Sequence, residues 1–152
     1  KMTPSDLIRE ALSRLRGLSQ SRNVLLAESF PVASETLEMT ADRGILLRVL
    51  QNLLTNAIQF SPSGETVVTG FETIRSDKVL FYIEDKGPGI PPAYREAVFE
   101  KFTQINSRKD GRKYATGLGL TFCKMAVDLH KGFIRIAGDG TIGSRFEFII
   151  PR

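Results

Sequence analysis

Apolar residues recur with the 3.6-residue period of a helix in three parts of the chain. The first follows Thr3 and Pro4, a capping residue and a residue suited to a first helical turn, and approaches its end near Gly17. The second covers residues 42–60 and opens on an aspartate, another capping residue. The third spans residues 117–131. The pattern therefore predicts three long helices.

Other stretches are rich in β-branched and aromatic residues and are bounded by turn residues, as strands are. Five strands are predicted on this basis: residues 23–30, 66–74, 78–84, 133–137 and 145–150. We also expect a short extended piece at residues 36–39 to pair with the first strand, and a short helix from Ala93 to about Lys101. Helices and strands in this order are typical of an α+β fold in which a layer of helices covers a mixed sheet.

The 152 residues are enough for one hydrophobic core, and 41% apolar with 25% charged residues is ordinary for a globular domain. No apolar run reaches the roughly 20 residues that span a bilayer, and no signal peptide precedes the first helix. We therefore expect a domain without direct membrane contact. The single cysteine, Cys123, cannot form a disulfide within the chain, in keeping with a reducing, cytoplasmic location.

The net charge of +4 indicates an anionic partner. The densest basic segment comprises Arg108, Lys109, Arg112 and Lys113, and it lies in a polar, glycine-containing loop over residues 103–116. Neither a long basic stripe nor an aromatic RNA-binding signature accompanies it. We therefore expect this segment to attract phosphate groups and do not expect nucleic-acid binding.

Three amides stand apart from the apolar face of the second helix. Asn52, Asn56 and Gln59 follow one another at i, i+4 and i+7, so they line one stripe. Asn is a poor helix former, which makes two of them one turn apart costly for a face that only meets solvent. Carboxamide oxygens are hard, neutral ligands that suit a magnesium ion shared with phosphate oxygens. A solvated helix face is the alternative interpretation.

Two glycine-rich segments follow at the expected ends of elements. The strand VLFYIE is followed by Asp85, Gly87 and Gly89. At such a strand end a carboxylate can accept a hydrogen bond from an adenine amino group. The two glycines allow the backbone to approach a base closely. The segment 117–120 opens the third helix, whose free N–H groups suit a phosphate. Each segment taken alone is also compatible with a simple turn or helix start. Gly143-Ser144, just before the last strand, is a weaker signal of the same kind and is also compatible with a simple turn.

Taken in order, four short motifs resemble the catalytic, ATP-binding domain of two-component sensor histidine kinases. These are an N box at residues 51–57, a first glycine box at 85–89, an F box at 99–102 and a second glycine box at 117–120. The resemblance runs from about Thr3 to Pro151. It implies a Bergerat-type two-layer α/β sandwich, formed by residues 1–152 as one domain, in a superfamily shared with gyrase, a heat-shock chaperone and MutL. ATP and Mg²⁺ are the implied ligands.

The resemblance also implies roles for particular residues. Asn56 corresponds to the magnesium-binding Asn and, with Asn52, to the catalytic pair, and Asp85 to the residue that reads adenine. Residues 103–116 resemble the ATP lid, which we expect to be mobile without nucleotide and ordered with it. The implied ATP-binding residues are Asn56, Gln59, Phe60, Asp85, Gly87, Gly89, Ile90, Phe102, Thr116, Gly117, Leu118, Gly119 and Leu120.

Three positions refine the expected function. The gyrase-, chaperone- and MutL-like ATPases carry a water-activating Glu where this chain has Asn52, and an amide has no comparable basicity, which favours a kinase over a hydrolase. Gln59 and Ala115 replace a residue that is commonly basic and one that is often Gly. The uncharged Gln59 keeps open an alternative, a pseudokinase that binds nucleotide weakly or not at all and acts by docking to a partner.

The only histidine, His130, lacks the sequence surroundings of a phosphoacceptor. We expect it to be structural or solvated at a helix C-terminus, where a positive charge suits the helix dipole. The resemblance therefore implies an acceptor histidine on a separate dimerisation domain and a response regulator that receives the phosphoryl group. The whole protein is expected to be a cytoplasmic sensor or a membrane-anchored one with this part in the cytoplasm.

Overall fold

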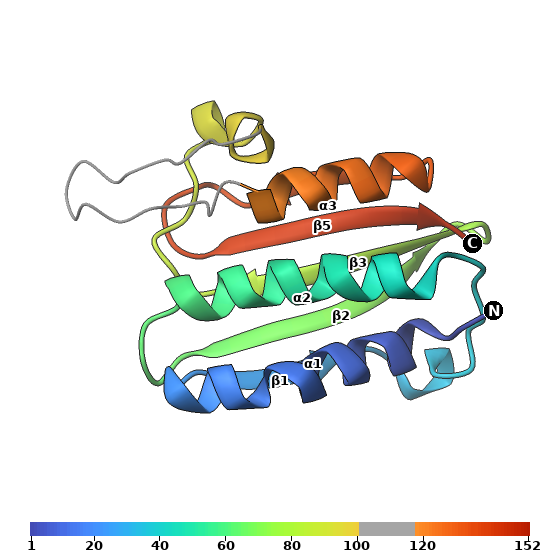
Figure 1. Cartoon of the computed structure of the whole chain (residues 1–152), viewed down its shortest axis with the longest axis horizontal. Coiled ribbons are helices and arrows are strands. Elements are labelled where there is room, and N and C mark those ends of the chain that lie inside the picture. Colours follow the sequence, from blue (N-terminus) through green and yellow to red (C-terminus); the bar gives the residue numbers. More distant parts are fainter. Residues whose placement is uncertain (101–117) are drawn as a thin grey trace.

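Five strands form one open mixed sheet (Figure 1). The computed structural model describes residues 1–100 and 118–152. The strand order is β1-β2-β3-β5-β4, with β1 parallel to β2 and every other neighbouring pair antiparallel. The bounds are β1 Leu25–Ser29, β2 Thr66–Ile74, β3 Lys78–Asp85, β4 Phe133–Ala137 and β5 Ser144–Pro151. Each of the five predicted strands is therefore present, within about two residues of its expected ends.

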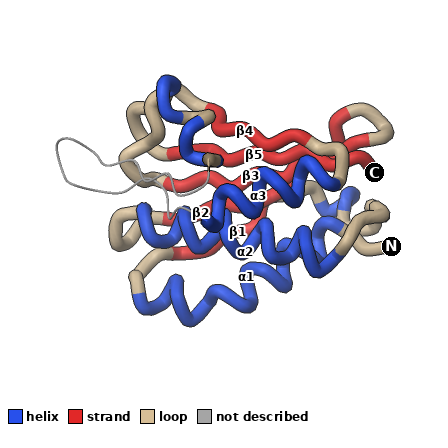
Figure 2. Tube along the Cα trace, turned by 45° about the horizontal axis from the view of Figure 1, so that its top comes forward, coloured by secondary structure: helices blue, strands red, loops and turns tan. Residues whose placement is uncertain are grey.

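Three helices cover one face of this sheet (Figures 1 and 2). They are α1 Pro4–Ser21, α2 Arg43–Phe60 and α3 Leu118–Leu129. The predicted caps are confirmed: the Thr3 side chain accepts the Asp6 N–H at 3.2 Å, and Oδ1 of Asp42 accepts the Ile45 N–H at 3.0 Å. The predicted two-layer α/β sandwich, with helices on one face of a mixed sheet, is confirmed as well.

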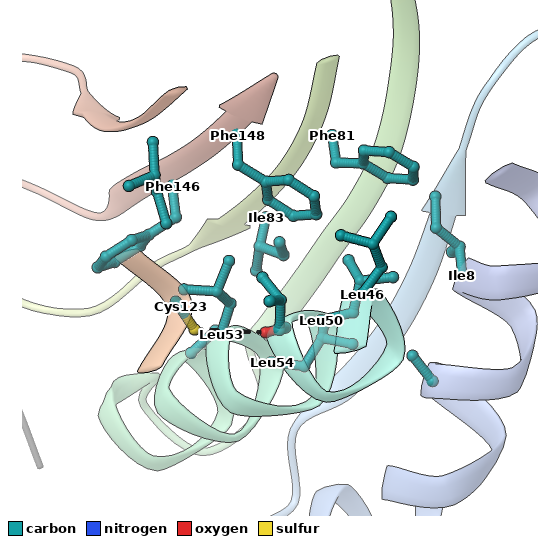
Figure 3. Packing of buried hydrophobic residues seen from close by; sticks show 14 of the residues in the cluster. Ile8, Leu46, Leu50, Leu53, Leu54, Phe81, Ile83, Cys123, Phe146 and Phe148 are labelled. Atoms are coloured by element: carbon teal, nitrogen blue, oxygen red, sulfur yellow. Dashed lines mark hydrogen bonds between the residues drawn. The ribbon is translucent and has the colours of Figure 1, made fainter. Parts of the chain in front are cut away.

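The core lies between the sheet and α2 (Figure 3). Alternate residues of β3, among them Phe81 and Ile83, point toward the helices, and Phe81 stacks on Phe148 of β5 with ring centroids 4.8 Å apart. From α2, Leu50 and Leu53 meet them and are fully buried. Full burial of one such side chain contributes roughly 1.5–3 kcal/mol. The core therefore fixes how α2 lies against β3, and with it the positions of the polar residues at their ends.

Two local expectations were wrong. Residues 36–39 do not pair with β1, because β2 takes that place as a parallel neighbour, and Met39 instead bridges to Met2. The helix expected from Ala93 to about Lys101 is replaced, in its described part up to residue 100, by two 3-10 turns, Pro92–Tyr94 and Ala97–Phe99. Pro91 and Pro92 restrict the backbone there, and only Val98 is deeply buried, so little packing favours a longer helix.

α1 ends at Ser21, about one turn beyond Gly17 and close to the expected end of this helix. The apolar residues of α3 do not all face the core. Met125 and Leu129 belong to the periodic apolar pattern that predicts this helix, but they are 61% and 76% exposed. The buried positions are Leu120, Cys123, Ala126 and Val127.

The ends of three elements meet at one end of the molecule, on the left in Figure 1. β3 ends at Asp85, α2 ends at Phe60, and α3 begins at Leu118. Both chain termini lie at the opposite end. The glycine boxes and the amide stripe are therefore brought to a common region by the fold itself.

Candidate functional site

A buried carboxylate stands at the end of β3. Asp85 is 8% exposed, and its Oδ1 accepts the Gly87 N–H at 2.8 Å. Burial raises the pKa of Asp85 to about 6, although the backbone N–H groups of Gly87 and Ser144 both favour the ionised form. Near neutral pH the Asp85 side chain is therefore a carboxylate with little access to water. A hydrogen-bond donor on a ligand would stabilise this buried charge.

Glycines allow the backbone around Asp85 to pack closely. A Cβ on Gly87 would lie 2.8 Å from the Phe60 carbonyl oxygen, and one on Gly143 would lie 2.4 Å from the Asp85 carbonyl oxygen. Gly143 has φ +69°, a conformation that favours glycine, and its N–H donates to the Gly87 carbonyl at 2.7 Å. The turn before β5 is thus packed against the loop after β3.

These segments enclose what we call the Asp85 pocket. It is lined by Asn56, Phe60, Asp85, Pro88, Gly89, Ile90, Ser144 and Phe146. Five of these residues were predicted from the sequence; Pro88, Ser144 and Phe146 were not. The signal that could have found Ser144 is Gly143-Ser144 itself, because β5 pairs with β3 so that Ser144 stands opposite Asp85. The weak sequence signal at Gly143-Ser144 therefore belongs to a residue, Ser144, that lines this pocket.

A second recess, the amide hollow, lies between α2 and the start of α3. Its lining residues are Asn52, Thr55, Asn56, Gln59, Gly119 and Leu120. Nδ2 of Asn52 reaches the Gly119 carbonyl oxygen at 3.5 Å, a long contact that ties the amide stripe to the first turn of α3. The predicted stripe and the second glycine box thus share one surface, and Thr55 joins them as a residue that the sequence reasoning missed.

Asn56 lines both the Asp85 pocket and the amide hollow. Its side chain is buried, at 5% exposure, yet Oδ1 finds no hydrogen-bond partner among the described residues. Leaving a buried acceptor unsatisfied costs roughly 1–3 kcal/mol. An orphaned amide oxygen at the junction of two hollows is therefore a candidate ligand atom for a cation or a donor group.

Cys123 and His130, the single cysteine and the single histidine of the chain, lie outside both recesses and make structural contacts. Cys123 is fully buried, its Sγ lies 3.7 Å from the Val49 carbonyl oxygen, and burial raises its pKa to about 12, so this side chain packs in the core. His130 has Nδ1 2.7 Å from the Ala126 carbonyl oxygen, and its Nε2 accepts the Asp42 N–H at 3.2 Å. His130 is therefore a structural residue at the C-terminal end of α3, as expected.

Comparison with known protein families gives one match over most of the chain. Residues 41–152 fit the family described as histidine kinase-, DNA gyrase B- and HSP90-like ATPase. The chain belongs to this ATPase family. The match begins just before α2 and includes both recesses, and α1 and β1 extend the same two layers on the N-terminal side.

Relatives within this ATPase family include sensor kinases. The chain is 31% identical to the sensor histidine kinase TmoS of Ectopseudomonas mendocina over 147 residues, which are 97% of this chain and 15% of TmoS. Two solved structures are similar along 99% of the chain: full-length ShkA in complex with AMPPNP (25% identity, TM-score 0.81, 30% of that chain) and the histidine kinase ThkA in complex with the response regulator TrrA (26%, 0.81, 40%). This chain thus spans less than half the length of each of these three proteins.

Several predicted positions of this ATPase domain lie outside the described residues. These are Phe102, Thr116, Gly117 and the whole of the expected lid, residues 103–116. Of Leu118 only the backbone is described, as the first residue of α3. No helix within residues 1–100 and 118–152 is both long and apolar enough to cross a membrane.

Proposed function

We propose that this chain is the ATP- and magnesium-binding catalytic domain of a sensor histidine kinase. In this role it transfers the γ-phosphoryl group to a histidine on a separate dimerisation domain, for relay to a response regulator. The observation that carries the proposal is the position of Asn56, whose unpartnered Oδ1 lies where the Asp85 pocket joins the amide hollow. A nucleotide has the same two parts, a base and a polyphosphate.

The Asp85 pocket suits an adenine ring. The Asp85 carboxylate can accept a hydrogen bond from the exocyclic amino group, which guanine does not present at that position. Phe60, Ile90 and Phe146 supply apolar walls, and Gly89, with φ +77°, keeps side-chain atoms away from the base. A mainly apolar pocket with a single buried acceptor is the usual design of a selective small-molecule site.

The amide hollow suits phosphate oxygens and their cation. Oδ1 of Asn56 is a hard oxygen donor of the type that Mg²⁺ prefers, and its lack of a protein partner fits a metal ligand. Bound Mg²⁺ would neutralise charge on the phosphate oxygens. Asn52 and Gln59 can donate hydrogen bonds from the same helix, and the N-terminus of α3 adds backbone N–H groups. Residues of this chain therefore orient the triphosphate, and the nucleophile is the acceptor histidine of another domain.

The composition of the amide hollow favours phosphoryl transfer to a protein over hydrolysis. Among the described residues that line it there is no Asp, Glu or His. The Asn52 amide, directed at the Gly119 carbonyl, has no basic electron pair with which to take a proton from water. The response regulator in the ThkA complex, and AMPPNP in ShkA, support the proposed partner and nucleotide. A cytoplasmic position, where ATP is available, follows from the proposed reaction.

Calorimetry with ADP and Mg²⁺ tests this proposal. Wild-type protein should bind ADP. Asp85→Asn should bind it at least tenfold more weakly, because an amide has only one acceptor oxygen to serve both the Gly87 N–H and adenine. In Asn56→Ala the affinity for ADP should no longer depend on Mg²⁺. Asp128→Asn is the matched control, because its carboxylate is exposed and, within residues 1–100 and 118–152, forms an ion pair with Lys124 alone. Absence of binding by the wild type would overturn the proposal. Radiolabel from γ-labelled ATP should reach the acceptor histidine of the full-length protein and be lost in Asp85→Asn.

A further inference from the structure

Arg95 follows the 3-10 turn Pro92–Tyr94 and makes contacts that the nucleotide site does not explain. Its guanidinium donates to three backbone carbonyls, which belong to two parts of the chain that are far apart in sequence. Nε lies 3.4 Å from the Ile90 oxygen and Nη1 lies 3.4 Å from the Ile136 oxygen. Nη2 donates to the Gly138 oxygen. One side chain thus joins the loop after β3, the end of β4 and the turn between β4 and β5.

The segments that Arg95 joins lead into two walls of the Asp85 pocket. The Ile90 side chain lines one wall, and the turn that begins at Gly138 leads to Ser144 on the other. The two walls are in backbone contact: a Cβ on Gly140 would lie 2.7 Å from the Ile90 carbonyl oxygen. At this spacing a small relative shift of the segments changes the width of the pocket.

The chemistry of arginine fits this arrangement. A guanidinium is planar and always charged, and its five N–H groups form a rigid fork that can serve several acceptors at once. The hydrogen-bond partners of Arg95 among the described residues are carbonyl oxygens alone. A lysine ammonium is a single point and cannot reach all three carbonyls from one position. The role of the side chain is therefore to hold backbone segments together.

We propose that Arg95 is a positioning residue for the base end of the nucleotide site: its guanidinium fastens the loop that carries Asp85 and Ile90 to the β4–β5 turn that leads to Ser144, and so sets the width of the pocket between them. Arg95 does not line the pocket and acts on the base through these two walls. The proposal rests on the proposed function in one respect, since it assumes that the pocket receives adenine.

Binding measured on folded protein gives the first test. Arg95→Ala should raise the Kd of ADP roughly tenfold, the size expected for the loss of charge-assisted hydrogen bonds, and Arg95→Lys should recover little of it. The Kd of adenosine should rise by the same factor, because Arg95→Ala does not change the amide hollow. The ratio of the Kd of GDP to the Kd of ADP should become smaller. A loss of global stability alone would change neither the Kd values nor the preference for ADP over GDP at temperatures well below the Tm of each variant.

A matched control is available at the other end of the molecule. Nε of Arg152 donates to the Glu38 carbonyl oxygen at 2.8 Å, so Arg152→Ala also removes an arginine-to-backbone bond but lies beside the chain termini. It should leave the Kd of ADP unchanged. Equal losses of affinity in Arg95→Ala and Arg152→Ala, or no loss in Arg95→Ala, would overturn the positioning role.

A second measurement separates this proposal from the proposed function. Without any nucleotide, hydrogen exchange of the Gly143 amide, which donates to the Gly87 oxygen at 2.7 Å, should be faster in Arg95→Ala than in the wild type or in Arg152→Ala. Unchanged exchange of this amide would contradict the role of Arg95 whatever the chain binds. Failure of the wild type to bind ADP, with faster exchange in Arg95→Ala, would contradict only the assignment of the pocket to adenine.

Discussion

The backbone N–H of Asp42 donates to Nε2 of His130 at 3.2 Å, so the only histidine of the chain joins the end of α3 to the first turn of α2. The other ring nitrogen lies 2.7 Å from the Ala126 carbonyl oxygen. Both nitrogens that could form a phosphoramidate are therefore occupied within the fold, at the end of α3 that lies away from the amide hollow.

We expect this chain alone to remain unlabelled when it is incubated with γ-labelled ATP and Mg²⁺. His130 has no free nucleophilic nitrogen, and the acceptor of the proposed kinase lies on another domain. The measurement is acid-labile radiolabel after gel separation, with the full-length protein as the positive control. Acid-labile label that appears on this chain and disappears in His130→Gln would show that His130 can leave its two partners and accept phosphate.

The raised pKa of Asp85 predicts a pH dependence of binding. The carboxylate must be ionised to accept from adenine, and burial raises its pKa to about 6, so protonation competes with the nucleotide below that pH. Affinity should therefore rise with pH, by roughly tenfold between pH 5 and pH 7.5 for a group of that pKa. Calorimetry with adenosine avoids titration of phosphate groups. The same pH profile in the wild type and in Asp85→Asn would assign the dependence to another group.

The same buried carboxylate should lower the stability of the unliganded protein. Its folded-state pKa is raised from 3.8 to about 6, so the native state binds more protons than the unfolded chain between these values. The contribution of Asp85 to stability is then fully present below pH 3.8 and is lost as pH rises through about 6. At pH 7.5 the loss amounts to about 3 kcal/mol as an order of magnitude.

Asp85→Asn should consequently raise the Tm of the unliganded protein at pH 7.5 while it weakens nucleotide binding. Near pH 4 the two proteins should unfold at similar temperatures, because the native carboxyl group is protonated there. Scanning calorimetry at both pH values measures this difference. A lower Tm of Asp85→Asn at pH 7.5 would mean that the ionised carboxylate stabilises the fold through contacts that outweigh its burial.

The sequence predicts elements well where local signals agree with packing. Asp42 marks the start of α2 and the turn residues after Phe60 mark its end, and both work without knowledge of the tertiary structure. α3 was harder, because its apolar residues fit two helical faces and only contact with the sheet decides that Cys123 is buried and Met125 is exposed. Periodicity identified the helix but not the face that packs.

The site residues also fall into those that a local signal reveals and those that only the packed structure reveals. Asn52, Asn56 and Asp85 were found because their residue types are unusual at their positions in a helix or at a strand end. Ser144 was missed because its closeness to Asp85 arises from pairing between β3 and β5, which no local pattern encodes. The unpartnered oxygen of Asn56 is likewise a property of the packed structure alone.

Gly143 offers a test of the contact between the two walls of the Asp85 pocket. Gly143→Ala must place a Cβ 2.4 Å from the Asp85 carbonyl oxygen in a residue with φ +69°, so the Asp85 backbone has to move. Gly64→Ala is a matched control, with φ +89° and nothing within 4 Å of its Cβ. Both should lose about 1 kcal/mol to backbone strain.

Only Gly143→Ala should also weaken ADP binding, by roughly tenfold or more, because displacement of Asp85 by a fraction of an ångström spoils its hydrogen bond to the base. Thermal unfolding and calorimetry on the two variants separate the effects. Equal ADP affinity in Gly143→Ala and Gly64→Ala would show that the loop after β3 tolerates this shift.

Gln59 decides between the proposed kinase and the pseudokinase alternative. It lies on the stripe of Asn52 and Asn56 and lines the amide hollow with its side chain exposed. A Lys there would approach the phosphates with a positive charge, whereas Gln donates an uncharged hydrogen bond. Charge-assisted bonds contribute roughly 1.5–3 kcal/mol against about 1 for neutral ones, so Gln59→Lys should gain about 1 kcal/mol, or roughly fivefold in ATP affinity or phosphotransfer.

The control for this prediction is Ser76→Lys, which adds the same charge in the exposed β2–β3 turn at the far end of the sheet and should change neither quantity. Arg112→Ala and Lys113→Ala complete the set, since these two residues of the expected lid, outside the described residues, are the other candidates to supply the charge. If Gln59→Lys has no effect while Arg112→Ala and Lys113→Ala lower phosphotransfer, the lid supplies the charge and the kinase is complete without a basic residue at position 59. If all three substitutions leave both quantities unchanged, phosphate recognition here is too weak to respond, as expected of a domain that binds nucleotide without transferring its phosphate.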